Sequence, residues 1–326
     1  MPAALEIGFI GIGNMGWPMA ANLAKAGYAV TVHDADPQRA DRFAAEHGVA
    51  AGSDLVALGR TADVVVTMLP NGRLVREVVL GSGTGGSLLA GLRPGSVVVD
   101  MSSSDPSGTR ALGEELQAAG VALIDAPVSG LVDRARTGSL TIMIGADDEP
   151  ALQKVRPVLE CLGERLFRTG GLGCGHAMKA LNNVVAASAF TATAEALIIG
   201  QRFGLDPKVM AEILNVSTGR SFHSDVSFPG HVLTRRFATG FSLGLLAKDV
   251  GIAADLGDTV AANAPLVQLI RRLWQEGCEE VGGDQDNSAI VQRWERLNGV
   301  RLEPGKPAGP AESEGRDYGA SSRDNP

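Results

Sequence analysis

The sequence predicts an α/β fold, in which a doubly wound sheet fills the first half of the chain and an all-α C-terminal domain follows. Three observations support this prediction. Apolar strands alternate with helical segments up to Phe167, a glycine-rich turn links the first strand to the first helix, and no clear strand follows Gly171. Strands that alternate with helices form parallel sheets, because a parallel connection must cross over the sheet.

The length and charge of the chain limit its class and its partners. A chain of 326 residues is too long for one small core and suggests two domains. The net charge of −8 argues against nucleic acid or an anionic membrane surface as the main partner. A small anionic substrate is still compatible with this charge, because a pocket can be locally cationic.

The cysteines and the N-terminus indicate a cytoplasmic protein. Cys161, Cys174 and Cys278 are odd in number and widely spaced, so they predict neither a disulfide framework nor a metal site. No Lys or Arg precedes Lys25, so we interpret the apolar N-terminal run as a strand and not as a signal peptide. No uninterrupted apolar segment reaches the about 20 residues that a transmembrane helix needs.

The first strand, Leu5–Ile10, ends in a glycine-rich turn with the spacing G-x-G-x-x-G, and a helix follows over Trp17–Ala26. The glycines allow a tight turn and a close approach of the backbone to a pyrophosphate, and the helix N-terminus offers free N–H groups. We therefore predict cofactor contacts at Gly11, Gly13, Asn14, Met15 and Gly16.

A second strand, Tyr28–His33, places Asp34 at its end, 18 residues beyond Gly16. The motif alone would also fit an ordinary glycine-rich turn, but this context favours a dinucleotide site, where Asp34 accepts from the ribose hydroxyls. A 2′-phosphate would meet the Asp34 carboxylate, so NAD is favoured over NADP. Arg39 is near enough in sequence to keep NADP as the less favoured alternative.

The alternation continues to the end of a Rossmann-type domain, which we assign to residues 1–171. Ligands of such sheets bind beyond the carboxyl ends of the strands, where Leu69-Pro70, Ser103 and the turn Asp125–Gly130 fall. The expected strands are Asp63–Met68, Ser96–Asp100, Val121–Asp125, Leu140–Gly145 and Arg165–Phe167, and the expected helices are Pro37–Glu46, Arg73–Leu80, Pro106–Ala119 and Glu149–Leu162.

Residues 172–302 are predicted to form the all-helical domain. A long helix runs from Gly173 to about Phe203, and further helices are expected over Pro207–Asn215, Leu243–Leu256, Leu266–Glu280 and Ser288–Leu297. Residues 303–326 are rich in Pro, Gly, Ser and charge, so we predict a disordered tail, with a partner-binding segment as the alternative.

Lys179, Asn182 and Asn183 lie at positions i, i+3 and i+4 of the long helix and share one of its faces. These polar groups stand on an otherwise apolar helix, so they need partners or a substrate. A lone lysine near a helix start is usually solvated, but the adjacent asparagines and the preceding glycines favour a functional role. For His176, on the same face, a structural role is favoured over that of a general base.

Four blocks of the chain resemble the β-hydroxyacid dehydrogenase family, which includes 3-hydroxyisobutyrate dehydrogenase, tartronate semialdehyde reductase and 6-phosphogluconate dehydrogenase. They span residues 8–249 in the order of the family. The blocks are Gly8–Leu23, Asp125–Gly130, Gly171–Gly173 with Lys179–Asn183, and Lys248-Asp249.

The resemblance implies reversible hydride transfer between NAD(P) and a small acid with a hydroxyl at its β carbon. It also implies that the helical domain supplies a dimer contact, in a homodimer or homotetramer. By resemblance, Lys179 is the catalytic lysine, Ser129 and Gly130 hold the substrate carboxylate, and Asn183 with Asn182 orients the substrate. By the same resemblance, the remaining cofactor contacts are Leu69, Pro70, Ser103 and Lys248.

Hydride transfer between a hydroxy acid and nicotinamide needs these residue types, independently of the resemblance. Hydride transfer from an alcohol leaves a hydroxyl proton, which a positioned lysine can remove, or return in reduction. Burial and a cationic nicotinamide would lower the pKa of Lys179, and a substrate carboxylate would raise it. The Ser129-Gly130 turn offers a hydroxyl and backbone N–H groups that suit a carboxylate.

The substrate block departs from the family at Leu131, where a second glycine is usual, and at Arg134, where a small residue is common. Leu131 adds bulk at the proposed substrate-binding turn, and Arg134 and Arg136 add positive charge. We therefore hypothesise a substrate that differs from plain 3-hydroxyisobutyrate, with a second polar or anionic group. The alternative is that these side chains point to solvent.

Two other functions remain open. Imine reductases with the same fold usually replace the catalytic lysine, so Lys179 argues against that chemistry. A non-catalytic cofactor-binding or partner-binding protein would be expected to lose Lys179 or the asparagines, and this chain keeps all of them. No metal is expected to take part, because the His, Cys, Asp and Glu residues lack ligand spacing.

Overall fold

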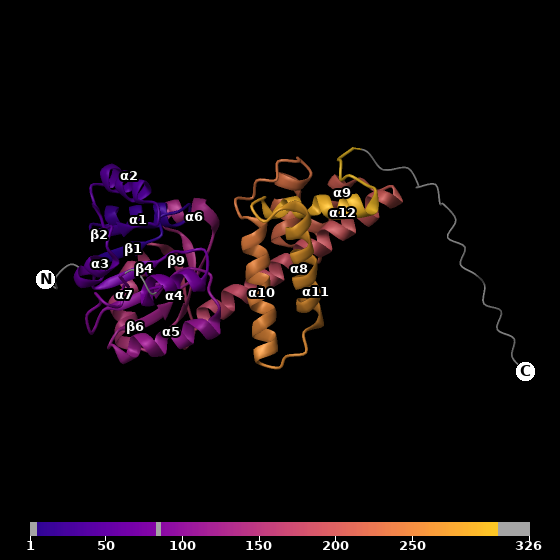
Figure 1. Ribbon diagram of the computed structural model, residues 1–326. Helices are drawn as coiled ribbons and strands as arrows, with labels where there is room; N and C mark the ends of the chain where they lie inside the picture. Colours follow the sequence, from indigo (N-terminus) through magenta and orange to yellow (C-terminus); the bar gives the residue numbers. More distant parts are fainter. Residues whose placement is uncertain (1–4, 83–85, 306–326) are drawn as a thin grey trace, which may run out of the picture.

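The computed structural model describes residues 5–82 and 86–305, which form two bodies side by side (Figure 1). The first body is a sheet flanked by helices, and the second is helical. Helix α8 (Cys174–Phe203) begins against the sheet and runs through the second body, so it connects the two. The chain passes from sheet to helices between β9 and α8, at residues 171–173.

The first six strands of the sheet are parallel, as the alternation of strands and helices predicts. Their spatial order is β3-β2-β1-β4-β5-β6, so the direction of winding reverses between β1 and β4. Ligands of doubly wound sheets bind at this kind of reversal. The strands are β1 (Glu6–Ile10), β2 (Ala29–His33), β3 (Ala50–Ala51), β4 (Val64–Thr67), β5 (Val97–Asp100) and β6 (Ala122–Asp125).

The far edge of the sheet is mixed, an addition to the predicted parallel sheet. Strand β8 (Leu140–Gly145) is antiparallel to both β6 and β7 (Val128–Ser129), and β9 (Gly163–Gly170) is parallel to β8. The chain reaches β8 through β7 and a short helix, and an antiparallel neighbour needs no crossover of the sheet.

Both faces of the sheet are buried, as a doubly wound fold requires. Val64 and Val66 point into one core and Val65 into the other, because successive side chains of a strand alternate in direction. Helices α1 (Gly16–Lys25), α2 (Pro37–His47), α6 (Leu131–Thr137) and α7 (Glu149–Glu160) contribute to the first core. The second core is covered by α3 (Leu55–Thr61), α4 (Gly72–Leu80) and α5 (Pro106–Ala118).

Local sequence explains where most of these helices begin. The side chains of Asp36, Asp105 and Asp148 each accept a hydrogen bond from a backbone N–H in the first turn of α2, α5 and α7. A proline follows each cap within the first two helical positions, where its missing N–H costs nothing.

The second body packs α8 against α9 (Pro207–Asn215), α10 (Leu243–Thr259), α11 (Pro265–Val281) and α12 (Val291–Asn298). Its core centres on Phe190, Phe228 and Trp274, which are fully buried. By length and composition α8 would suffice to cross a membrane, but 56% of its most apolar window is buried inside the protein, as in the core helix of a globular domain.

The elements that the sequence did not predict are short or irregular. Strands β3 and β7 have two residues each, and α3 and α6 have seven, which is too few for a periodic pattern. A π-helix, η1 (His223–Val232), contains Pro229, and a short 3-10 helix, η2 (Asn287–Ile290), precedes α12. Most of the predicted disordered tail, residues 306–326, lies outside the described residues.

Candidate active site

The glycine-rich turn between β1 and α1 has one open position and two closed ones. A Cβ added to Gly11, whose φ is +93°, would lie 2.4 Å from the Met68 carbonyl oxygen, and one added to Gly16 would lie 1.9 Å from the Gly11 carbonyl oxygen. A Cβ on Gly13 would meet no atom within 4 Å, and Gly13 and Asn14 are exposed. The turn thus has room on its outer side for a pyrophosphate, which fits a dinucleotide cofactor.

Asp34 connects the end of β2 to this turn. Its Oδ2 accepts a hydrogen bond from the Ile12 N–H at 2.9 Å, and its Oδ1 pairs with the Arg39 guanidinium at 3.1 Å. Arg39, which kept NADP as the alternative cofactor, is therefore paired with Asp34, the carboxylate that favours NAD. The arrangement presents a carboxylate at the end of β2, where such folds bind the ribose of a dinucleotide.

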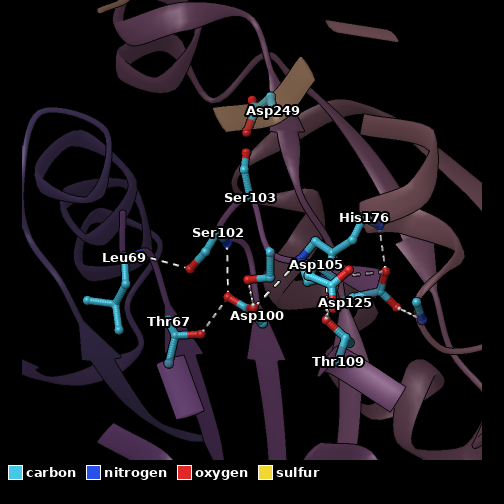
Figure 2. Close-up of polar contacts among 12 residues, drawn as sticks. Thr67, Leu69, Asp100, Ser102, Ser103, Asp105, Thr109, Asp125, His176 and Asp249 are labelled. Atoms are coloured by element: carbon cyan, nitrogen blue, oxygen red, sulfur yellow. Dashed lines mark hydrogen bonds and ion pairs between the residues drawn. The ribbon is translucent and has the colours of Figure 1, made fainter. Parts of the chain in front are cut away.

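Asp100, at the end of β5, holds the loops that follow β4 and β5 (Figure 2). Its Oδ1 accepts from Thr67 Oγ1 at 2.9 Å and from the Ser102 N–H at 3.0 Å, and its Oδ2 accepts from Ser104 Oγ at 2.7 Å. Ser102 Oγ in turn accepts from the Leu69 N–H at 2.9 Å. Asp100 is buried, and sequence reasoning missed it, although it is the charged last residue of an apolar strand.

A second set of contacts joins the β5 loop to the helical body. The Lys248 ammonium donates to the Ser103 carbonyl oxygen at 2.6 Å and pairs with Asp249 Oδ1 at 2.9 Å. The other Asp249 oxygen accepts from Asn183 Nδ2 at 2.6 Å, and Asn182 Nδ2 donates to Asn183 Oδ1 at 3.1 Å. The structure thus brings together side chains from α8 and α10 with the loop after β5.

Lys179 is half-buried on α8, one turn before Asn183. Burial lowers its pKa; the nearby Asp249 carboxylate opposes this shift, and the Lys248 ammonium adds to it. The net direction is downward, so more of the Lys179 amine is unprotonated near neutral pH than in a free lysine. An amine of this kind can accept a proton from an alcohol and return it.

The predicted substrate turn has an unusual backbone. Strand β7 ends at Ser129, Gly130 has a φ of +140°, and Leu131 has a φ of +59°, in the left-handed region. This conformation costs a non-glycine residue about 1–2 kcal/mol, which explains why a glycine suits the position. Within the described part of the chain, neither Ser129 nor Gly130 makes a hydrogen bond to Lys179.

The two arginines of α6, Arg134 and Arg136, are exposed and have different neighbours. The stem of Arg134 covers Gly130, because a Cβ added there would lie 2.7 Å from the Arg134 Cβ and Cδ atoms. Arg136 instead lines a hollow together with Gly13 and Asn14. Arg134 is therefore placed near the proposed substrate turn, whereas Arg136 lies on the cofactor side.

The N-terminus of α8 is fixed by Asp125, the last residue of β6. Its Oδ1 accepts from the Gly173 N–H at 2.8 Å and its Oδ2 from the His176 N–H at 2.7 Å. Burial raises the pKa of the Asp125 carboxyl, and His176 and these N–H groups oppose that shift. The His176 ring is buried against Thr109 and Asp100, which supports a structural role and leaves it no access to a substrate.

Metal-binding clusters and disulfides do not enter this geometry. Across residues 5–82 and 86–305, no three His, Cys, Asp or Glu side chains gather as they would around a metal ion. Cys161, Cys174 and Cys278 are unpaired thiols.

Comparison with known families covers almost the whole described chain. Residues 6–171 match the NAD binding domain of 6-phosphogluconate dehydrogenase. Residues 173–294 match the family described as the NAD-binding domain of NADP-dependent 3-hydroxyisobutyrate dehydrogenase.

Individual proteins are similar over nearly their full length. The chain is 35% identical to 2-(hydroxymethyl)glutarate dehydrogenase of Eubacterium barkeri, over 94% of this chain and 100% of that protein. It is 37% identical to the mitochondrial 3-hydroxyisobutyrate dehydrogenase of Mus musculus, over 90% and 88% of the two chains. A solved structure of Mycobacterium tuberculosis 3-hydroxyisobutyrate dehydrogenase with L-serine superposes with a TM-score of 0.81 at 33% identity, covering 89% and 99%.

Proposed function

The chain belongs to the β-hydroxyacid dehydrogenase family, and on that premise we propose that Lys179 is the general acid and base of its reaction. The protein is an NAD-dependent oxidoreductase that acts on the CH–OH group of a small hydroxy acid.

The placement of Lys179 carries this proposal. Lys179 is half-buried on α8, the charges of Asp249 and Lys248 act on its amine, and Lys248 contacts the loop at the carboxyl end of β5. In oxidation, Lys179 Nζ takes the hydroxyl proton of the substrate while the C–H bond breaks and the C=O bond forms. NAD supplies the acceptor for the hydride. In reduction, the protonated amine returns the proton to the carbonyl oxygen.

The cofactor is assigned to the strand ends around the winding reversal. We propose that the Gly11–Gly16 turn holds the pyrophosphate and that Asp34 accepts from the adenosine ribose. Leu69, Pro70 and Ser103 then contact the cofactor from the loops after β4 and β5. These loops are tied to each other through Ser102 and Asp100, so their spacing is fixed.

We assign the substrate carboxylate to the turn of Ser129 and Gly130, and its orientation to the asparagines of α8. Asn183 is fixed by Asp249, and Asn182 is half-buried beside it. Arg134 is exposed, but its stem starts over Gly130, so its positive charge is within reach of this turn and favours an acid with a second anionic group. A relative named for 2-(hydroxymethyl)glutarate, a dicarboxylate, supports this choice.

We also propose a cytoplasmic homodimer or homotetramer. Unpaired cysteines agree with a reducing compartment. The helical body exposes apolar side chains along α8 and α9, among them Phe203 at 85% and Ile213 at 56% exposure, and another copy of the chain would cover them. Gel filtration with light scattering measures the oligomer.

A turnover assay tests the proposed function. NADH formation is followed with NAD or NADP and a panel of 3-hydroxyisobutyrate, 2-(hydroxymethyl)glutarate, serine, glycerate and threonate. The variants are Lys179→Ala, which removes the amine, and Lys179→Arg, whose guanidinium keeps the positive charge but stays protonated and cannot accept a proton. Lys208→Ala is the matched control, because Lys208 is exposed on α9.

We expect turnover with NAD on at least one acid, loss of turnover in both Lys179 variants, and wild-type rates in the control. Full activity of Lys179→Ala would refute the assigned role. Best turnover on 3-hydroxyisobutyrate would refute the proposal of a second anionic group.

A further inference from the structure

A buried polar network fastens the first turn of α8 to the ends of β5 and β6 (Figure 2). At its centre is His176, which is 1% exposed. Its Nδ1 lies 2.9 Å from Thr109 Oγ1, its Nε2 lies 3.6 Å from Asp100 Oδ2, and its backbone N–H donates to Asp125. The side chain and the backbone of one residue thus contact groups of β5, α5 and β6.

The hydrogen atoms of this network admit two arrangements of the His176 ring. Thr109 Oγ1 has one hydrogen and two neighbours, His176 Nδ1 and the Asp105 carbonyl oxygen, each at 2.9 Å. If Thr109 donates to His176, the ring carries its hydrogen on Nε2. If Thr109 donates to Asp105, Nδ1 must be the donor, and an unprotonated Nε2 would then set its lone pair against a carboxylate. The first arrangement directs an Nε2–H at Asp100 Oδ2, 3.6 Å away, and sets no lone pair against the carboxylate.

Asp100 lies between His176 and the loops that follow β4 and β5, which we call the cofactor loops. The Asp100 oxygen that faces His176 also accepts from Ser104, and the other oxygen holds the Ser102 N–H. Ser103, whose carbonyl receives Lys248, lies between these two serines. The loop after β5 therefore packs against α8 where His176 Nε2 faces Asp100 at 3.6 Å without a hydrogen bond, and it is attached to α10 through Ser103 and Lys248.

On α8, Lys179 lies between His176 and Asn183, whose amide donates to Asp249 beside Lys248. It is three residues beyond His176, about 4.5 Å further along the helix axis and on the same face. A helical turn is stiff, so a tilt or a rotation of the first turn of α8 moves Lys179 with it. The position of His176 against Asp100 therefore sets the position of the Lys179 amine relative to the strand ends.

We propose that His176 is a positioning residue for the reaction: through Asp100 and Thr109 it holds α8 in the register that places Lys179 at the cofactor loops. This inference rests on the proposed role of Lys179 as the proton-transfer residue. Since its ring is buried, His176 does not touch the substrate. Its loss is expected to lower kcat and to leave cofactor affinity unchanged, because Thr67, Ser102 and Ser104 still hold Asp100.

The test compares two variants with a matched control. His176→Leu removes both ring contacts, and His176→Gln keeps an acceptor for Thr109 and a donor for Asp100. His223→Leu is the control, because the His223 ring is also buried in the helical body, with Nδ1 2.9 Å from Ser227 Oγ and no contact to the loops described above. For each variant we measure kcat, KM, the NADH dissociation constant and the melting temperature.

For His176→Leu we expect kcat to fall by about a hundredfold, the cost of a misplacement of about 1 Å. Its NADH dissociation constant should match that of the wild type, and His176→Gln should recover most of the lost rate. His223→Leu should keep the wild-type kcat even if its melting temperature falls by as much as that of His176→Leu. Equal kcat in the His176→Leu and His223→Leu variants would overturn the inference.

Amide hydrogen exchange separates a failure of this inference from a failure of the proposed function. If the wild type oxidises no acid in the panel, or if Lys179→Ala retains activity, the proposed function fails by itself. The positioning role is then decided by exchange at residues 101–105 and 173–182. Faster exchange there in His176→Leu than in His223→Leu supports the role, and equal exchange refutes it.

Discussion

Replacing Asp34 with Asn should shift the cofactor preference of the protein from NAD toward NADP. Asp34 makes three contacts, with the N–H groups of Ile12 and Asp36 and with the guanidinium of Arg39. An asparagine oxygen can still accept from Ile12, so the glycine-rich turn keeps its support. The negative charge is lost, and Arg39 becomes free to meet a 2′-phosphate.

The size of the shift follows from the charges at this position. A carboxylate and a phosphate about 4 Å apart repel by about 4 kcal/mol at an effective dielectric constant of about 20. Arg39 is 39% exposed, so solvent and salt screen the site and reduce the repulsion to about 1.5–3 kcal/mol. Since about 1.4 kcal/mol corresponds to a tenfold change in affinity or in kcat/KM, kcat/KM for NADP should rise about 10- to 100-fold. For NAD it should fall about tenfold, because a charged acceptor for the ribose becomes a neutral one.

The assay is the ratio of kcat/KM for NADP and NAD, measured on one substrate. Asp36→Asn is the matched control, because Asp36 lies two residues away and near Arg39, and an asparagine can replace it as the cap of α2. We expect the control to keep the wild-type ratio. An unchanged ratio in Asp34→Asn would refute the assignment of Asp34 to the ribose.

Three further outcomes follow from the geometry. Burial lowers the pKa of Lys179 below its ordinary value of 10.5. In pH profiles of kcat/KM, alcohol oxidation should therefore rise with pH, with a midpoint below 10.5, because it needs the unprotonated amine, and reduction should fall, because it needs the protonated one. Gly13→Ala should keep the melting temperature of the wild type but weaken NADH binding in a fluorescence titration, because its Cβ enters open space; Gly16→Ala should lower the melting temperature, because its Cβ would meet the Gly11 carbonyl oxygen. Burial lowers the pKa of His223 from 6.5 to about 4, so between these two pH values His223 is protonated in the unfolded chain and neutral in the folded one. The stability contributed by the neutral ring is fully present above pH 6.5, and the free energy of unfolding should fall by about 3 kcal/mol between pH 6.5 and 4. Urea titrations measure this fall, which should be smaller in His223→Leu.

Part of the site follows from local pattern alone. The G-x-G-x-x-G turn after an apolar strand predicts a pyrophosphate site, and the structure has an open Gly13 there. The spacing of Lys179, Asn182 and Asn183 predicts one helix face, since a helix has 3.6 residues per turn. The pairing of the β5 loop with α10 was anticipated only through the family resemblance, which named Ser103 and Lys248 as contacts of one cofactor.

Other parts of the site have no local signal. Asp100 and His176 are 76 residues apart in the sequence, and nothing near either residue indicates that they meet. Leu131 occupies a left-handed backbone position that its residue type disfavours, so propensity would place it elsewhere. The antiparallel edge of the sheet depends on which neighbour β8 meets, and that is decided by packing.

The sequence by itself determined the longer strands, the starts of most helices, the glycine-rich turn, the preference for NAD and the face of α8 that carries Lys179. These features depend on side-chain periodicity, caps and backbone freedom, which act over a few residues. Only the tertiary structure decided that Asp100, Asp125 and His176 join α8 to the sheet, and that Asp249 lies between Lys248 and Asn183. Those contacts form because burial forces polar groups to find partners, and the partners come from whichever segments the fold brings alongside.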